Sequence, residues 1–196
     1  MTAIDQSAVE TLFTNARTHN VWKDKSVSEQ TLRELYHLMH FGPTSMNCQP
    51  LRVLFLNSQA AKERLKPALM PGNQEKTMKA PVVAVLGYDT EFHEHLPRMF
   101  AHNKDAKSLF EGKTDFINTT AFRNSSIQGG YFILAARSLG LDTGPMSGFN
   151  NAAVDEEFFP DGKVKSNFLC SLGYGDHSSL FPRQARFEFD EVCRIL

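Results

Sequence analysis

Cysteine is scarce in this chain, and its positions follow no recognisable pattern. Cys48, Cys170 and Cys193 are odd in number and lie far apart in a sequence of 196 residues. A disulfide framework uses cysteines in even number, and no Cys-x-x-Cys pair is present to indicate a zinc or redox site. The cysteines therefore argue against a disulfide-stapled secreted domain. We expect reduced thiols in a cytoplasmic protein.

A strong charge of either sign is also missing. The chain has 21 basic and 22 acidic residues, mixed along its length, and a net charge of -1. It contains no basic stripe of the kind that binds nucleic acid and no polybasic segment for a membrane surface. No apolar run approaches the roughly 20 residues that cross a bilayer. The N-terminus lacks the charged and apolar regions of a signal peptide. We expect neither nucleic acid nor a membrane as a partner.

Phenylalanine, in contrast, is abundant. The chain has 16 Phe against 4 Tyr and 1 Trp. This much bulky apolar surface indicates either a large core or an oligomer interface. A chain of this length most simply forms one domain, 1–196, and buries roughly 70% of the surface of its unfolded state.

Long helices and few short strands are predicted from the hydrophobic periodicity. Ser26 and Glu29 have the spacing of a helix capping box. Segment 71–81 is expected to be a loop with one helical turn, 145–148 a loop, and 88–118 a mobile surface element. The periodicity predicts helices over 7–16, 32–40, 59–66, 119–139 and 151–159, and strands over 53–56, 82–87 and 168–172. No Gly-rich turn joins a strand to a helix, so we predict an α+β fold and not a Rossmann fold.

The helix predicted over 119–139 is apolar nearly all round in its second half. Such a helix is either fully buried or in contact with a second subunit. Gly129 and Gly130 each cost about 1 kcal/mol relative to Ala in a helix, so we expect another backbone or side chain to approach closely there. The polar cluster 122–128 at its start serves either interface hydrogen bonds or a ligand. Together with the Phe excess, this helix favours a homodimer.

Segment 41–50 is the most informative stretch of the sequence. Gly42 and Pro43 end the preceding helix, because Pro cannot continue it. The segment then presents Thr44, Ser45, Asn47 and Gln49 before Pro50 closes it. Read by itself, it is either an ordinary polar turn or a loop that offers hydroxyls and amides to a flat, polar ligand.

The motif Pro-Thr-Ser-x-Asn-x-Gln-Pro over 43–50 resembles the Pro-Ser-Ser-x-Asn-x-Gln-Pro flavin loop of the FMN-dependent nitroreductase family. Other stretches agree in order and spacing over nearly the whole chain, most closely with the subgroup that contains malonic semialdehyde reductase. The resemblance implies a central, mostly antiparallel sheet surrounded by helices. It also implies an intertwined homodimer with FMN at the subunit interface.

The resemblance also implies which residues bind FMN. Read by itself, Arg17 is either a helix-end cation or a phosphate ligand; the resemblance favours the phosphate, although Asn20 and Val21 stand where the family often has a second cation. Arg186 fits the C-terminal phosphate ligand better than Arg183. The implied set is Arg17, Thr18, His19, Pro43, Thr44, Ser45, Asn47, Gln49, Asn73, Lys76, Pro145, Met146, Ser147, Gly148 and Arg186.

Lys76 is the residue that we expect to tune the flavin. Asn73 and Lys76 are three apart and share one face of a helical turn. Reduced flavin carries negative charge near N1 and O2, which an ammonium stabilises. Flavin N5 would transfer the hydride, so no side chain is predicted to be a nucleophile. No metal site is predicted either, because His37 and His40 lack a third ligand.

The implied activity is an NAD(P)H-dependent FMN oxidoreductase, with NADH or NADPH as reductant and a small-molecule electron acceptor. The subgroup resemblance implies reduction of malonic semialdehyde to 3-hydroxypropionate, with substrate contacts expected in 88–118. One alternative is a broad-scope nitroaromatic or quinone reductase. Another is a flavin-binding sensor or carrier that does not turn over.

Overall fold

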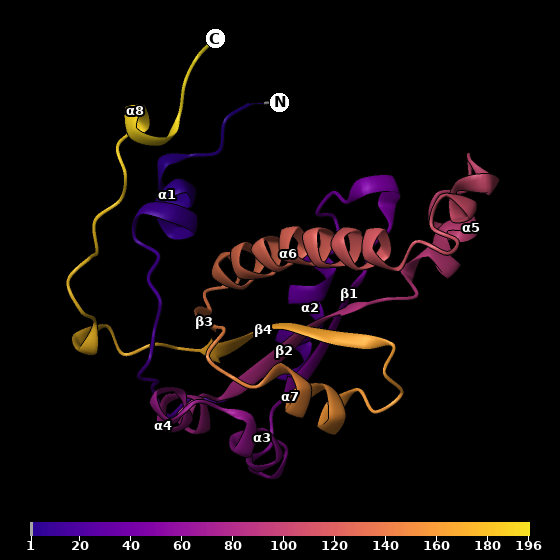
Figure 1. The fold of residues 1–196 in the computed structure, drawn as a ribbon. Helices are drawn as coiled ribbons and strands as arrows, with labels where there is room; N and C mark the ends of the chain where they lie inside the picture. Colours follow the sequence, from indigo (N-terminus) through magenta and orange to yellow (C-terminus); the bar gives the residue numbers. More distant parts are fainter. Residues whose placement is uncertain (1) are drawn as a thin grey trace.

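The computed structural model describes residues 2–196 and has a four-stranded antiparallel sheet at its centre (Figure 1). The strand order is β1-β2-β4-β3, with β1 (Leu51–Leu56), β2 (Val82–Asp89), β3 (Asp142–Met146) and β4 (Val164–Gly173). The helices are α1 (Gln6–Val9), α2 (Glu29–Met39), α3 (Gln59–Leu65), α4 (Pro71–Lys79), α5 (Leu96–Met99), α6 (Thr114–Ser138), α7 (Asn151–Phe158) and α8 (Phe189–Val192). The predicted α+β class and antiparallel sheet are confirmed.

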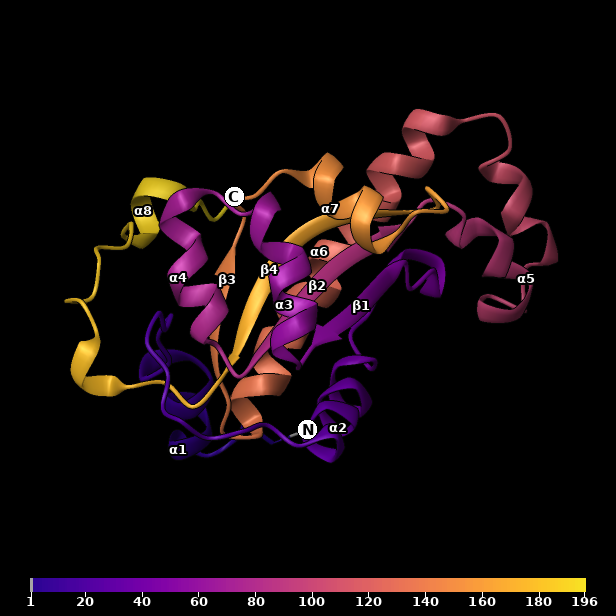
Figure 2. The ribbon, with the colours of Figure 1, turned by 90° about the horizontal axis from the view of Figure 1, so that it is seen from below.

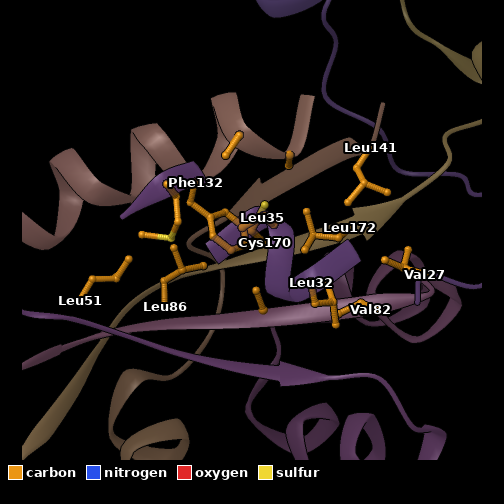
Figure 3. Packing of buried hydrophobic residues seen from close by; sticks show 14 residues of the cluster. Val27, Leu32, Leu35, Leu51, Val82, Leu86, Phe132, Leu141, Cys170 and Leu172 are labelled. Carbon is orange, nitrogen blue, oxygen red and sulfur yellow. The ribbon is translucent and has the colours of Figure 1, made fainter. Parts of the chain in front are cut away.

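Helices cover both faces of the sheet, and β2 shows why. Val82 and Leu86 face α2 and α6, whereas Val83 and Val85 face α3 and α7, because successive side chains of a strand alternate between faces. Burial on both faces explains the continuous apolar run over 82–87. On the first face, Leu35 of α2 and Phe132 of α6 belong to the same cluster as Cys170 of β4 (Figure 3).

Helix α6 is the longest element and lies along the sheet. It begins at Thr114, five residues before the predicted start at 119. A Cβ on Gly129 would stand 2.6 Å from the ring of Phe168, so the predicted close approach is confirmed there. A Cβ on Gly130 would have no heavy atom of the described residues within 4 Å, apart from its chain neighbours and the backbone of its own helix. Gly130 therefore lies at the molecular surface.

The capping box predicted at Ser26 and Glu29 is wrong. Ser28 is the residue before the helix, with extended φ and ψ of -72° and 153°, and its Oγ accepts a hydrogen bond from the N–H of Thr31 at 3.1 Å. Glu29 is therefore the first helical residue and cannot be the third. The apolar stripe that follows was predicted correctly, and it buries Leu32 and Leu35.

The loop predicted over 71–81 is a helix of nine residues, α4. Pro71 occupies its first turn, where a missing N–H costs nothing. The other end is closed from a distance: the buried ammonium of Lys62 in α3 donates to the carbonyls of Met78 and Ala80 at 3.0 and 2.7 Å. This contact between distant residues cannot be predicted from the local sequence of 71–81.

Segment 88–118 forms short helical elements around a small hydrophobic cluster, which Cys48 also joins. Phe92, Leu96 and Phe110 are fully buried there, with Ala106 and Ala121 beside them. In Figure 2 this segment, with α5, extends beyond the sheet at the end of the molecule opposite α8. The segment lies at the outside of the fold, as expected, but its buried side chains form a small core.

The C-terminal residues run away from the sheet. After β4 the chain passes through a turn at His177–Ser179, and residues 181–196 are exposed. Figure 1 draws them as a long yellow strap that passes through α8 before it reaches the C-terminus. Several large apolar side chains of this strap lie open to solvent, among them Phe181, Phe187, Phe189 and Val192. An extended segment with this much exposed apolar surface is typical of an interface.

Candidate functional site

The structure separates the predicted site residues into two groups. The first, which we name the β3 group, comprises Arg17, Thr18, His19, Asn73, Lys76 and 145–148. The second is the loop 43–49, which lies against α5 and α6. No hydrogen bond or ion pair among residues 2–196 joins the two groups.

The β3 group is assembled by backbone pairing at the edge of the sheet. Thr18 forms a parallel bridge with Thr143, and the N–H of His19 donates to the Thr143 carbonyl at 3.0 Å. A Cβ on Gly144 would stand 2.6 Å from the carbonyl oxygen of His19, so only glycine allows this approach. The segment around Arg17 is thereby fixed beside the end of β3.

The predicted loop 145–148 is partly a strand. Pro145 and Met146 pair with Cys170 and Leu169 of β4, and only Ser147 and Gly148 lie beyond the end of β3. A proline is tolerated in this position because β3 is an edge strand of the chain. The correction leaves the backbone at Ser147 and Gly148 as the part that is free to approach a ligand.

Helix α4 adjoins this end of β3. The side-chain amide of Asn73 donates to the carbonyl of Gly148 at 2.9 Å, and a Cβ on Gly148 would stand 2.3 Å from that nitrogen. Lys76, on the same face of α4, is half-buried and has neither a hydrogen bond nor an ion pair within residues 2–196. An ammonium without an ion pair, on the helix face whose Asn73 contacts the glycine backbone, suits an anionic, planar group such as a reduced flavin. The residues therefore fit the predicted cofactor.

Two arginines link the C-terminal strap to the segment around Arg17. Arg17 donates to the carbonyl of Phe181 at 2.5 Å, and Arg183 donates to the carbonyl of Thr14 at 2.6 Å. Arg186 bonds only to carbonyls of its own strap, at Gln184 and Ala185. Within one chain, it is thus Arg183 that lies beside the Arg17 segment. The assignment of Arg186 to the phosphate stays a prediction.

Loop 43–49 holds its backbone in an unusual conformation. Met46, Asn47 and Gln49 have φ values of 51°, 49° and 39°, a region that costs a non-glycine residue roughly 1–2 kcal/mol. The Asn47 amide donates to the carbonyl of Met99 at 2.8 Å, and the Thr44 hydroxyl accepts from the Gln49 N–H. Strain that surrounding contacts maintain is characteristic of ligand-binding loops.

Side chains of the polar cluster 122–128 also hold the loop and the start of β1 in place, a role that the sequence analysis missed. Buried Asn124 accepts a hydrogen bond from the N–H of Ser45 at 2.8 Å, and buried Gln128 accepts from the N–H of Leu51 at 3.0 Å. Interface bonding and ligand binding had been the two alternatives. The structure adds a third, in which α6 positions the loop. The spacing of two amides four residues apart on an apolar helix was the available signal.

A groove of about 850 Å³ lies between α2 and the free edge of β1. Apolar side chains of both elements line it, together with Arg52 and Arg98. Strand β1 is an edge strand, so its outer backbone groups are free to pair with another strand. No pattern in the sequence predicted this groove.

The structure also places the residues that the sequence raised as a possible nucleophile or metal pair. Burial raises the pKa of the Cys48 thiol to about 11, so a thiolate nucleophile is unavailable at neutral pH. His37 is exposed, and its ring lies 5.5 Å from that of His40 without a third ligand nearby. Among residues 2–196, none of the helices combines the length and apolar character that crossing a bilayer requires.

Comparison with known proteins identifies the fold and the family. A family model described as Nitroreductase family matches residues 14–174. The chain belongs to the nitroreductase family. Two curated relatives of this nitroreductase-family chain carry the provisional name NADH dehydrogenase/NAD(P)H nitroreductase. The protein from Polynucleobacter asymbioticus is 55% identical over 193 residues, covering 98% of each chain. The protein from Burkholderia lata is 57% identical over 195 residues, covering 100% of each.

Solved structures agree on the fold. A provisionally named nitroreductase from Bacillus subtilis is 22% identical and superimposes with a TM-score of 0.89, covering 98% of this chain and 100% of that chain. A second, from Exiguobacterium sibiricum, was solved in complex with FMN. It is 18% identical, with a TM-score of 0.87 over 100% of this chain and 99% of that chain. The predicted family and nitroreductase-like fold are confirmed.

Proposed function

We propose that this nitroreductase-family protein is an NAD(P)H-dependent FMN oxidoreductase. The observation that carries the proposal is the half-buried residue Lys76, which makes no hydrogen bond or ion pair within residues 2–196 and lies one helical turn after Asn73, the side chain that bonds to the Gly148 carbonyl. The names of the relatives and the FMN-bound structural neighbour support it. When bound, FMN supplies the redox chemistry, because it takes a hydride from NADH or NADPH and passes it to a second substrate.

The residues of the chain would bind and orient the cofactor. Lys76 and Asn73 serve the edge of the ring, and the backbone around Gly148 lies against it. Arg17 and Thr18 hold the phosphate, because a guanidinium fork matches phosphate oxygens. His19 fixes that segment to β3 through its backbone. A C-terminal arginine, Arg186 or Arg183, completes the phosphate site.

A homodimer completes the site in this proposal. Loop 43–49 of one subunit would meet the β3 group of the other, since no hydrogen bond or ion pair joins them within residues 2–196. The outer face of α6 supports this arrangement, because Phe122, Ile127 and Tyr131 are exposed around the open surface at Gly130. The groove along β1 would receive the strap 181–196 of the partner subunit, whose exposed Phe side chains suit its apolar lining.

The physiological substrate in this proposal is malonic semialdehyde, reduced to 3-hydroxypropionate in the cytoplasm. The subgroup resemblance supports the substrate, and the odd, unpaired cysteines support the compartment. The second candidate is a broad-scope nitroaromatic or quinone reductase, which the nitroreductase names of the relatives favour. The third is a flavin-binding sensor or carrier.

A visible absorption spectrum of the purified, desalted protein tests the proposal first. Under anaerobic conditions, we expect oxidised-flavin absorption that bleaches when NADH or NADPH is added. Malonic semialdehyde, a nitroaromatic and a quinone are then compared as acceptors by kcat/KM. Bound flavin that neither reductant bleaches would favour the sensor. A protein that stays colourless after FMN is supplied would overturn the flavin assignment.

A further inference from the structure

Three side chains from distant parts of the sequence converge beside the β3 edge. His19 precedes the first strand, Asp142 begins β3, and His177 lies in the turn after β4. One ligand atom from each can be chosen so that all lie within 4.8 Å of one another. Nε2 of His19 is 3.2 Å from Oδ1 of Asp142, and Nε2 of His177 is 3.8 Å from Oδ2.

The imidazole of His19 is buried without a hydrogen bond. Its side chain is 0% exposed, and neither ring nitrogen has a hydrogen-bond partner within residues 2–196. The contact of 3.2 Å with Asp142 is therefore close but not aligned as a hydrogen bond. An unsatisfied buried polar group costs about 1–3 kcal/mol. A cation between the imidazole and the carboxylate would satisfy both groups.

The surroundings hold the two inner ligands in place. A Cβ on Gly175 would stand 2.0 Å from Nδ1 of His19, so the glycine backbone closes that side of the ring and leaves Nε2 facing Asp142. The N–H of Gly175 also donates to Oδ2 of Asp142 at 2.8 Å. Such outer contacts orient ligands at metal sites.

We propose that His19, Asp142 and His177 form a binding site for a divalent transition-metal ion, with Zn²⁺ as the best fit. Two imidazole nitrogens and one carboxylate are a common zinc ligand set. Ligands about 2.0 Å from a tetrahedral ion are about 3.3 Å from one another, close to the His19–Asp142 separation. His177 must move slightly inward; its side chain is 64% exposed on a short turn and is free to do so. Solvent supplies the fourth ligand.

Metal binding would join the Arg17 segment, β3 and the turn after β4. The site includes none of the residues proposed for the flavin ring. His19 also belongs to the predicted FMN-binding set, but its proposed part there is the backbone bond to Thr143, so its imidazole is available to a metal. The ion would stabilise the folded protein in proportion to its affinity and concentration. It would also fix the backbone two residues beyond Arg17.

Zinc titration of tag-free, EDTA-treated and desalted full-length protein tests the site. We expect one Zn²⁺ per chain by calorimetry, a rise in Tm with Zn²⁺, and a visible d–d spectrum of tetrahedral type with Co²⁺. His177→Ala removes an exposed ligand without disturbing the core, and should weaken Zn²⁺ binding about a hundredfold and abolish the Co²⁺ spectrum. His37→Ala removes an exposed histidine elsewhere and should leave both unchanged.

Two results would overturn the site. One is wild-type protein that binds no Zn²⁺. The other is His177→Ala protein that binds Zn²⁺ as wild type does, which would locate any binding elsewhere. Asp142→Asn keeps an oxygen for the Gly175 N–H but loses the charge, so weakened binding with an unchanged Tm in EDTA separates ligation from folding. These measurements do not need FMN, so their outcome is independent of the flavin assignment.

Discussion

Lys76 carries a charge that no other group in residues 2–196 neutralises. Its neighbour on α4, Lys79, is exposed and pairs with Glu75 at 2.6 Å. The two lysines therefore differ in environment while sharing a helix and a charge. This contrast provides a matched pair of variants.

Lys76→Met should lower the two-electron potential of bound flavin. An interaction with a charged donor is worth about 1.5–3 kcal/mol, which corresponds to about 30–65 mV for a two-electron couple. Spectroscopic redox titration against a reference dye measures the shift. Lys79→Met should leave the potential unchanged; equal potentials in the two variants would show that Lys76 does not tune the flavin.

Cys48 should resist alkylation in the folded protein. Burial raises the pKa of its thiol from 9.0 to about 11, and Cys170 is also buried, whereas Cys193 is exposed. At pH 8, iodoacetamide followed by peptide mass spectrometry should label Cys193 first and the other two only after unfolding. Because the folded state retains the Cys48 proton longer, this group lowers stability as pH rises from about 9 to about 11. Rapid native labelling of Cys48 would contradict its burial.

At the scale of elements, two contacts distant in sequence maintain structures that local patterns do not. Asn124 of α6 accepts the Ser45 N–H in the strained loop, and Lys62 of α3 closes the end of α4. Both side chains are buried, so removing either leaves backbone groups unsatisfied in a poorly solvated place. Each contact makes a separate prediction.

Asn124→Ala should destabilise the protein by about 1–3 kcal/mol, because the Ser45 N–H loses its acceptor. Urea unfolding at fixed protein concentration measures the loss. Asn118→Ala, an exposed change on the same helix, should stay within about 0.5 kcal/mol of wild type. A similar loss in both variants would indicate general weakening of α6 and not loss of the loop contact. The first variant should also bind FMN more weakly, since loop 43–49 is less fixed.

Lys62→Met should destabilise α4 by about 2–3 kcal/mol, because two charge-assisted hydrogen bonds are lost while the apolar stem is retained. Thermal and urea unfolding measure the loss, and hydrogen exchange should speed up over residues 71–79. The control is Lys66→Met, whose exposed ammonium lies 3.8 Å from Glu63 and contributes little. Unchanged exchange in α4 would refute the capping role of Lys62.

At the scale of the whole molecule, a single chain leaves much apolar surface exposed to solvent. Ile127 and Tyr131 on α6 are 42% and 39% exposed, and the strap after residue 180 exposes six large apolar side chains. Exposed apolar surface on a long helix and on an extended tail favours a second copy of the chain. The proposed dimer makes one prediction about assembly and cofactor together.

Ile127→Asp should produce monomers that lose FMN, because a carboxylate buried in an apolar interface costs several kcal/mol. Sedimentation velocity gives the assembly, and the visible spectrum gives the flavin content. Leu109→Asp introduces the same charge at a side chain that is 47% exposed on another segment, and should remain dimeric. Wild-type protein that sediments as a monomer would end the dimer proposal.

Local sequence determined much of the fold. The predicted elements include strands β1, β2 and β4 and helices α2, α3 and α7. They were predicted because apolar runs and helical periodicity are patterns of residues close together in the chain. The motif over 43–50 also indicated the family and a flavin loop. Its prolines, Pro43 and Pro50, restrict the backbone regardless of what packs nearby.

Only the tertiary structure decided the rest, because long-range contacts leave no mark on local periodicity. Helix α4 depends on the Lys62 ammonium, and Pro145 and Met146 are in a strand because β4 pairs with them. The role of Asn124 appeared once the chain brought loop 43–49 against α6. His19, Asp142 and His177 are unremarkable in sequence. The sheet edge alone makes them neighbours, since pairing of β3 with β4 and with the Thr18 segment brings their backbones together.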